Sequence, residues 1–261
     1  MNRAMLTIMK KDFYGITSNR RLFSEMLILP MILTVVLPSI LICSVYFASD
    51  DPDILKLLEL LPQGNTVDNL ELTIAGLIFN YILPTFFLMI PILTSSIMAA
   101  SSFVGEKEKH TLETLLYCPL TLKQIFQAKV LACFLFSMMV STLSFVVMVI
   151  VLELEVFFLM ANLLLPSVNW VVILCLFSPA ISLIAVTLIV RGSAKARSVE
   201  ESQQSAVFLI LPVILFVSGQ LAGVLLLNIW ILLGLSMICM VLAWIFMRNA
   251  LGRFTYEKLL M

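Results

Sequence analysis

Charged side chains are scarce in this sequence, and their scarcity argues against a soluble globular protein. Asp, Glu, Lys and Arg make up 12% of the 261 residues, whereas hydrophobic residues make up 61% and the mean hydropathy is +1.10. A soluble domain of this length has too much surface to solvate for such a composition. Long uncharged runs are instead typical of chains that lipid surrounds. We therefore expect an integral membrane protein.

Histidine and the usual catalytic motifs are also missing, which argues against an enzyme. The only histidine, His110, falls in a polar segment, so a histidine-based metal site or catalytic dyad in the membrane is excluded. The sequence has no G-x-S-x-G elbow and no G-x-x-x-x-G-K-[ST] phosphate loop, so ATP hydrolysis by that route is not expected. Glu200 and Glu201 could begin a Glu-Glu-x-x-x-Arg protease motif, but Ser205 stands where arginine is required. We predict no catalytic residue, no metal site and no bound cofactor, and the zero net charge favours no nucleic-acid partner.

Six apolar runs predict an all-α membrane protein with six transmembrane helices. At 1.5 Å per residue the first run is about 33 Å long, which is enough for the hydrocarbon core. The predicted spans are residues 26–47, 72–104, 130–152, 170–190, 206–226 and 229–247, within a transmembrane domain over 26–247. The last two spans join at a tight turn between Ser218 and Asn228, or at a short re-entrant element.

Two features of these spans carry further expectations. The second run exceeds one span, so it should tilt, kink near Pro84 or Pro91, or extend beyond the membrane. Its small residues over 94–102 favour close helix packing over a polar conduit. Trp170, at the start of the fourth span, is expected at the lipid interface.

The basic residues predict the orientation. If both termini are cytoplasmic, fifteen of the sixteen Lys and Arg residues lie inside and only Lys56 lies outside. The positive-inside rule then places both ends of the chain in the cytoplasm of a cell-membrane protein. The loop residues Glu153 and Glu155 fall on the outer side.

Residues 1–25 predict a cytoplasmic helix that lies in the inner membrane interface. Apolar and basic side chains occupy opposite faces of this helix. The apolar face carries Met5, Ile8, Met9, Phe13 and Ile16, and the other face carries Arg3, Thr7, Lys10 and Lys11. The alternative is a solvated leader helix.

Ionisable residues are absent from the predicted spans, so proton or ion coupling within the membrane is not expected. The informative polar segment is the cytoplasmic loop 105–123, which precedes the third span; residues 248–261 form a cytoplasmic tail. In this loop Thr111, Leu112, Leu115 and Leu116 share one side of a short predicted helix. That side packs on its own chain or on lipid, or it docks a soluble partner.

The loop resembles the Glu-x-Glu-x-x-Thr-Leu-Glu-x-Leu-Leu-x-x-Pro pattern of type-2 permeases of ATP-binding-cassette exporters. The matching residues are Glu106, Glu108, Thr111, Leu112, Glu113, Leu115, Leu116 and Pro119, with His110 where the family often has glycine. The stretch 193–204 and the tail 254–260 are similar to segments of the sodium-efflux-like branch of that family.

The resemblance implies a half-transporter, in which two six-span permeases, here a homodimer, work with two cytoplasmic ATPases that bind ATP and Mg²⁺. It implies that the coupling residues are Glu106, Lys107, Glu108, Thr111, Leu112, Glu113, Leu115 and Leu116, and that the second loop contacts the ATPase through Arg197, Glu200, Glu201 and Gln204. The substrate is expected to be an amphipathic peptide, drug or lipid. The alternatives are sodium or ion efflux, a membrane assembly factor that moves no solute, and an unfamiliar intramembrane enzyme.

Overall fold

The computed structural model describes residues 3–47, 70–108, 120–193, 198–204, 207–221 and 229–253, and every regular element in these ranges is a helix. In chain order the elements are α1 (Arg3–Thr17), α2 (Arg20–Met31), η1 (Ile32–Val36), α3 (Leu37–Phe47), α5 (Leu70–Leu77), η2 (Ile78–Ile82), α6 (Leu83–Phe87), α7 (Met89–Glu108), α9 (Leu122–Met160), α10 (Val168–Val172), η3 (Ile173–Phe177), α11 (Ser178–Ser193), α12 (Val199–Gln204), α13 (Val207–Leu221) and α14 (Ile229–Arg253). The all-α prediction is therefore confirmed.

Six helices in the described residues are long and apolar enough to cross a membrane, as predicted. They are Arg20–Phe47, Glu71–Glu108, Leu122–Met160, Val168–Ser193, Val199–Gly219 and Ile229–Ala250. Several run beyond the uncharged sequence that suggested them. The third helix has 39 residues and contains Lys129, Glu153 and Glu155, which lie outside the uncharged run 130–152 that predicted this span.

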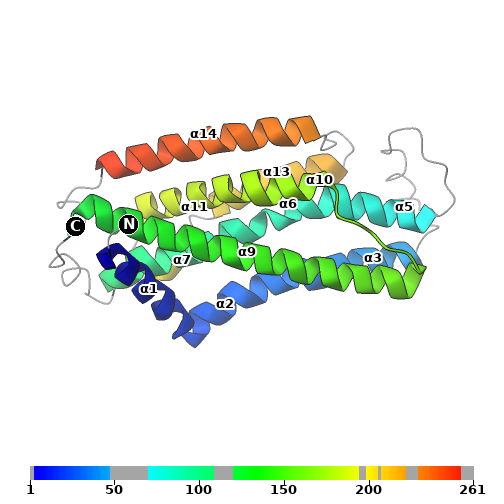
Figure 1. Cartoon of the computed structure of the whole chain (residues 1–261), viewed down its shortest axis with the longest axis horizontal. Coiled ribbons are helices and arrows are strands. Elements are labelled where there is room, and N and C mark those ends of the chain that lie inside the picture. The colour runs from blue at the N-terminus through cyan, green and yellow to red at the C-terminus, as the bar shows by residue number, and fades with distance from the viewer. Residues whose placement is uncertain are drawn as a thin grey trace.

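The helices form an elongated bundle and most of them follow its long axis, with α1 and the C-terminal end of α14 at the same end of the bundle (Figure 1). The second and fourth membrane helices are central: 67% of the most apolar stretch of each is buried, against 17% for the last helix. These central helices meet through α7 and α11, and α9 packs against both. Residues 94–100 of α7 are all buried, which agrees with the close packing expected of this run of small residues.

Three π-helical segments explain how the bundle accommodates proline. Each ends two residues before a proline: Ile32–Val36 before Pro38, Ile78–Ile82 before Pro84, and Ile173–Phe177 before Pro179. A proline has no N–H group, and its ring clashes with the carbonyl four residues earlier in an α-helix. The wider π-helical turn moves that carbonyl aside. The second membrane helix therefore adapts at Pro84, one of the two positions where a kink was expected.

The π-helical turn at Pro84 also creates a buried acceptor. The N–H of Leu83 donates to the carbonyl of Ile78, five residues earlier. At the same spacing the carbonyl of Phe79 corresponds to Pro84, which has no N–H to donate. The indole N–H of Trp170 donates to this carbonyl at 3.2 Å. The expected position of Trp170 at the lipid interface is therefore wrong, because its side chain is 1% exposed and finds its acceptor inside the protein.

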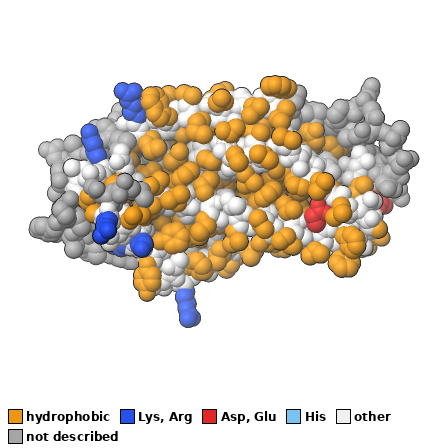
Figure 2. Space-filling model, in the orientation of Figure 1, with side chains coloured by type: hydrophobic (Ala, Val, Ile, Leu, Met, Phe, Trp, Pro, Cys, Tyr) orange, Lys and Arg blue, Asp and Glu red, His pale blue; other side chains and the backbone are white. Residues whose placement is uncertain are grey.

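Charged side chains gather at the ends of the bundle. On the face in Figure 2, Lys and Arg lie toward the end that holds α1 and the C-terminal end of α14, and Asp and Glu appear toward the other end. Apolar side chains cover the length between them on this face. The exposed apolar side chains of the chain include Phe208 and Leu215 of α13 and Met237 and Trp244 of α14. The chain is thus a multi-pass membrane protein with a lipid-compatible surface.

Candidate functional site

The helix α1 lies across the basic end of the bundle (Figure 1), and its apolar face is covered by protein. Phe13 packs edge-on against Phe136 of α9, with ring centroids 4.7 Å apart, and Ile8 packs against Ile125 and Ala128 of α9. The N-terminal segment is helical, and its apolar face packs against α9. Its basic Lys10 remains exposed.

A buried ionic cluster lies beneath α1 and joins three helices. The ammonium group of Lys129, on α9, is 2.8 Å from a carboxylate oxygen of Glu106 on α7 and 3.8 Å from Asp12 on α1. It also donates to the backbone carbonyl of Ser102 at 2.6 Å. Lys11 approaches the other oxygen of Glu106 at 2.6 Å. The cluster thus holds two cations and two carboxylates and is balanced in charge.

Burial makes the pairing in this cluster obligatory. The side chains of Lys129, Asp12 and Glu106 are 3%, 4% and 9% exposed. Burial raises the pKa of the Asp12 carboxyl, and Lys129 and the hydroxyl of Ser102, which donates at 2.7 Å, oppose this shift. An isolated buried charge would neutralise or disrupt the fold, so each group here requires the others. The cluster fixes α1, α7 and α9 relative to one another.

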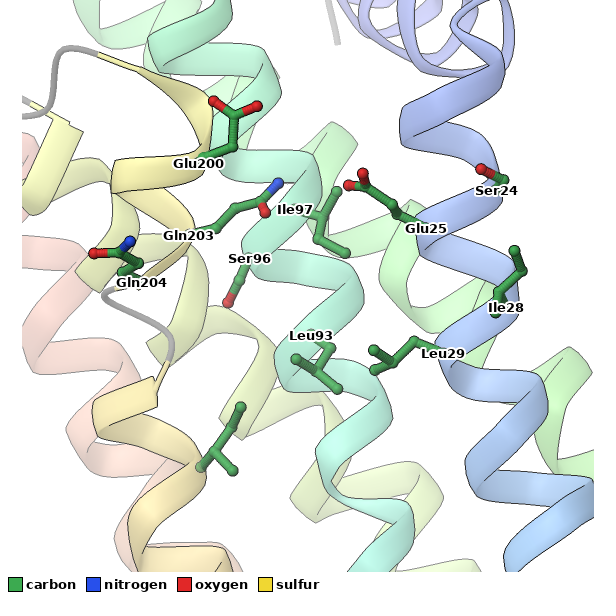
Figure 3. Close-up of a pocket in the computed structure, with 11 residues that line it drawn as sticks. Ser24, Glu25, Ile28, Leu29, Leu93, Ser96, Ile97, Glu200, Gln203 and Gln204 are labelled. Atoms are coloured by element: carbon green, nitrogen blue, oxygen red, sulfur yellow. The ribbon is translucent and has the colours of Figure 1, made fainter.

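A pocket of about 500 Å³ lies between α2, α7, α12 and α13. Figure 3 shows Glu25 of α2 and Gln203 of α12 pointing toward one another across α7, with Glu200 nearby. The opposite part of the pocket is apolar and includes Leu29 and Leu93.

One arginine connects the two acidic residues of the pocket. Arg21 is 3.1 Å from Glu25, one turn further along α2, and 3.5 Å from Glu200 on α12. All three side chains are partly exposed, at 74%, 42% and 65% respectively, so they lie at the mouth rather than the floor. Among the described residues at the mouth, two carboxylates and one guanidinium give a net charge of −1.

The floor of the pocket holds a hydroxyl group without a partner. Ser96 of α7 is 1% exposed, and within the part of the chain that the structure describes its Oγ atom makes no hydrogen bond. The neighbouring Ile97 and, from α13, Ile210 complete an apolar wall around it. The pocket therefore combines a carboxylate-rich mouth, an apolar wall and one buried polar group.

The predicted coupling residues are placed unevenly. Glu106, Lys107 and Glu108 form the last residues of α7, and Glu106 points into the ionic cluster rather than toward solvent. Glu200, Glu201 and Gln204 lie on α12, where Glu200 and Gln204 line the pocket. The remaining members lie outside the described residues: Thr111, Leu112, Glu113, Leu115, Leu116 and Arg197.

Sequence reasoning missed Asp12, Lys129, Glu25 and the role of Arg21. Asp12 had a usable signal, because it lies four residues from both Ile8 and Ile16 and so on the apolar face of α1. Lys129 had none, because a lysine at the start of a span is ordinarily read as a flanking charge.

Comparison with known proteins agrees with this architecture. A family model described as an ABC-2 family transporter protein matches residues 65–199, which is just over half of the chain. The matched range includes the whole of loop 105–123. Neither a curated protein nor a solved structure matches the chain.

Proposed function

Because this chain belongs to the ABC-2 family of transporter proteins, we propose that it is the membrane-spanning subunit of an ATP-driven exporter. The observation that carries the proposal is the family match over 65–199, a range that contains three of the six membrane helices and the loop expected of such a permease. ATP and Mg²⁺ belong to a separate cytoplasmic ATPase, and this chain binds neither. Its substrate is an amphipathic peptide, drug or lipid.

The ATPase docks on loop 105–123 from the cytoplasmic side. Leu112, Leu115 and Leu116 enter an apolar groove of the ATPase, and Glu113 pairs with basic residues at its rim. Buried apolar anchors contribute most of the energy of an interface, and exposed rim charges contribute less. Support for this role comes from the spacing of these residues and from the family match, which covers all of them.

Glu106 has a different role from the other members of the predicted coupling set. Its carboxylate is held by Lys129 and Lys11, so it acts as a positioning residue at the end of α7 rather than as a contact. The loop connects α7 to α9, and the ionic cluster ties the two helices together just where the loop begins and ends. Movement of the ATPase against the loop is therefore transmitted to α7, which lies in the centre of the bundle.

A second copy of the chain completes the transport pathway. Six membrane helices make half of an exporter of this kind, and the exposed apolar residues of α13 and α14 leave surface for a partner within the membrane. Both termini lie on the cytoplasmic side, where the basic end of the bundle meets the anionic leaflet.

Co-purification with the ATPase tests the proposed function. The variant Leu112→Asp/Leu116→Asp should lose the ATPase while it keeps the helix content and elution volume of the wild type. The matched control is Leu163→Asp/Leu165→Asp, because these leucines are 71% and 80% exposed in the loop that follows α9, at the opposite end of the bundle. Retention of the ATPase by the first variant would refute the docking role of the loop, and failure of the wild type to retain any cytoplasmic ATPase would refute the exporter.

A further inference from the structure

The pocket between α2, α7, α12 and α13 has the chemistry of a ligand site, and we propose that it binds an organic cation with an apolar body. The inference rests on the proposed function and names the class of substrate that the exporter takes from the inner side of the membrane. The ligand places its cationic group between Glu25 and Glu200 and its apolar body against Leu93 and Ile97.

Charge selects a cation for the mouth. Glu25 and Glu200 together carry two negative charges, and Arg21, which contacts both, supplies one positive charge. A monovalent cation brings this group to neutrality, whereas an anion meets a net negative field. Arg21 thus contacts one carboxylate on α2 and one on α12.

The interior of the pocket selects an apolar body of small-molecule size. The volume of about 500 Å³ lies within the range of sites that hold drug-sized ligands. Much of its wall is aliphatic, and Ser96 is the one lining residue among the described residues with a buried polar atom that has no protein partner. A buried hydroxyl left without a hydrogen bond is costly, so a polar atom on the ligand that bonds to Ser96 removes that cost.

The position of the pocket links occupancy to the rest of the molecule. A ligand here touches α2 on one side and α12 on the other, and both pack against α7. Since α7 ends at the loop where the ATPase docks, a bound ligand alters the contacts that hold α12 and α7 together near that loop. Substrate binding and ATPase contact thus meet on one helix.

Binding of a fluorescent cation to the purified chain tests the inference. Rhodamine 6G, a planar monovalent cation, is titrated with the chain in dodecyl maltoside micelles, with empty micelles as the blank and fluorescence anisotropy as the readout. Glu25→Gln should weaken binding about three- to fivefold, because each carboxylate at a partly exposed mouth contributes a modest amount. Glu25→Gln/Glu200→Gln should weaken it about tenfold or more, because Arg21 then leaves the mouth positive. Glu71→Gln, which removes the same charge at the far end of the bundle, is the control and should bind as the wild type does.

Two further variants separate recognition from damage to the fold. Arg21→Gln should tighten binding about threefold, because it doubles the net negative charge of the mouth, and a folding defect does not produce tighter binding. Ser96→Leu should abolish binding by filling the floor, with helix content unchanged.

Three results would overturn the inference: equal affinity of the wild type and the double glutamine variant, equal binding of the anionic dye fluorescein, or displacement of rhodamine 6G by phosphatidylglycerol at equimolar amounts. Phosphatidylglycerol has no cationic group, so this displacement would assign the pocket to the apolar chains of lipids. If the chain binds no cation yet retains its ATPase, the pocket assignment fails and the exporter stands. If it binds the cation as expected but retains no ATPase, the pocket stands and the exporter fails.

Discussion

Replacement of Lys129 by methionine should strongly destabilise the protein. The ammonium group is 3% exposed and contacts Glu106 at 2.8 Å, Asp12 at 3.8 Å and the Ser102 carbonyl at 2.6 Å. Methionine keeps the apolar stem but leaves two buried carboxylates with one cation, Lys11. Removal of one partner from a buried ion pair costs about 3–5 kcal/mol. Lys11, which is 52% exposed, still offsets part of the charge of Glu106, so we expect a loss of about 3 kcal/mol in unfolding free energy.

The destabilisation should depend on pH with a definite sign. Burial already raises the pKa of Asp12 above its ordinary 3.8, and loss of Lys129 removes the main opposing influence. A carboxyl whose pKa is higher in the folded than in the unfolded protein stabilises the fold at a pH below its pKa in the unfolded protein. This contribution is lost as the pH rises through its pKa in the folded protein. The difference between Lys129→Met and the wild type should therefore be smallest near pH 4 and should widen toward pH 7.

Unfolding by SDS in mixed micelles, followed by far-UV circular dichroism, measures this loss. The matched control is Lys123→Met, an exposed lysine on the same helix, which should cost less than about 0.5 kcal/mol. Addition of Asp12→Asn to Lys129→Met rebalances the cluster and should recover more than about 1 kcal/mol. If Lys129→Met is no less stable than Lys123→Met at pH 7, the cluster does not hold these helices together.

Three further predictions follow from particular contacts. Trp170→Phe removes the indole hydrogen bond to the Phe79 carbonyl and should cost about 1–2 kcal/mol in unfolding free energy. Trp230→Phe, at a site 75% exposed, should cost less than about 0.5 kcal/mol, and equal losses would contradict the buried hydrogen bond. In a cysteine-free background, Leu165→Cys should react with an impermeant thiol reagent on intact cells, whereas Tyr14→Cys should react only after the cells are permeabilised. The side chains of Leu165 and Tyr14 are 80% and 74% exposed and lie near opposite ends of the bundle. The reverse labelling pattern would invert the topology. Native mass spectrometry of the purified exporter should find two copies of the chain, and a stable complex with a single copy would argue against the homodimer.

The sequence predicted the membrane architecture because lipid imposes a simple rule on composition. Uncharged runs of sufficient length identified all six crossing helices, and the prolines marked where the second one adapts. The same reasoning failed for Trp170, because its acceptor is created by Pro84, which lies in another helix, and only packing brings the two together. The aromatic rings around the indole, Phe79, Phe87 and Phe145, come from three different helical elements.

The charged groups inside the bundle were harder to foresee for a related reason. Glu106 and Lys129 stand at the ends of two apolar runs, where a charge is normally solvated, and nothing local indicates that they face each other. Lys11 meets Glu106 from 95 residues away in the chain. At the mouth of the pocket, Arg21 likewise forms ion pairs with Glu25 on its own helix and with Glu200, which is far away in the sequence. Periodicity along one helix identifies a face, but the partner of that face is decided by the tertiary fold.

The ATP turnover of the reconstituted pair tests the central claim most directly. The chain and its cytoplasmic ATPase are purified together, placed in lipid nanodiscs and compared with the ATPase alone and with the complex that carries Leu112→Asp/Leu116→Asp. The account predicts that the chain changes the turnover of the ATPase severalfold and that the loop variant returns it to the value of the ATPase alone. An ATPase whose turnover is the same with the wild-type chain, with the loop variant and without either would contradict the assignment of this chain as the membrane subunit of an ATP-driven exporter.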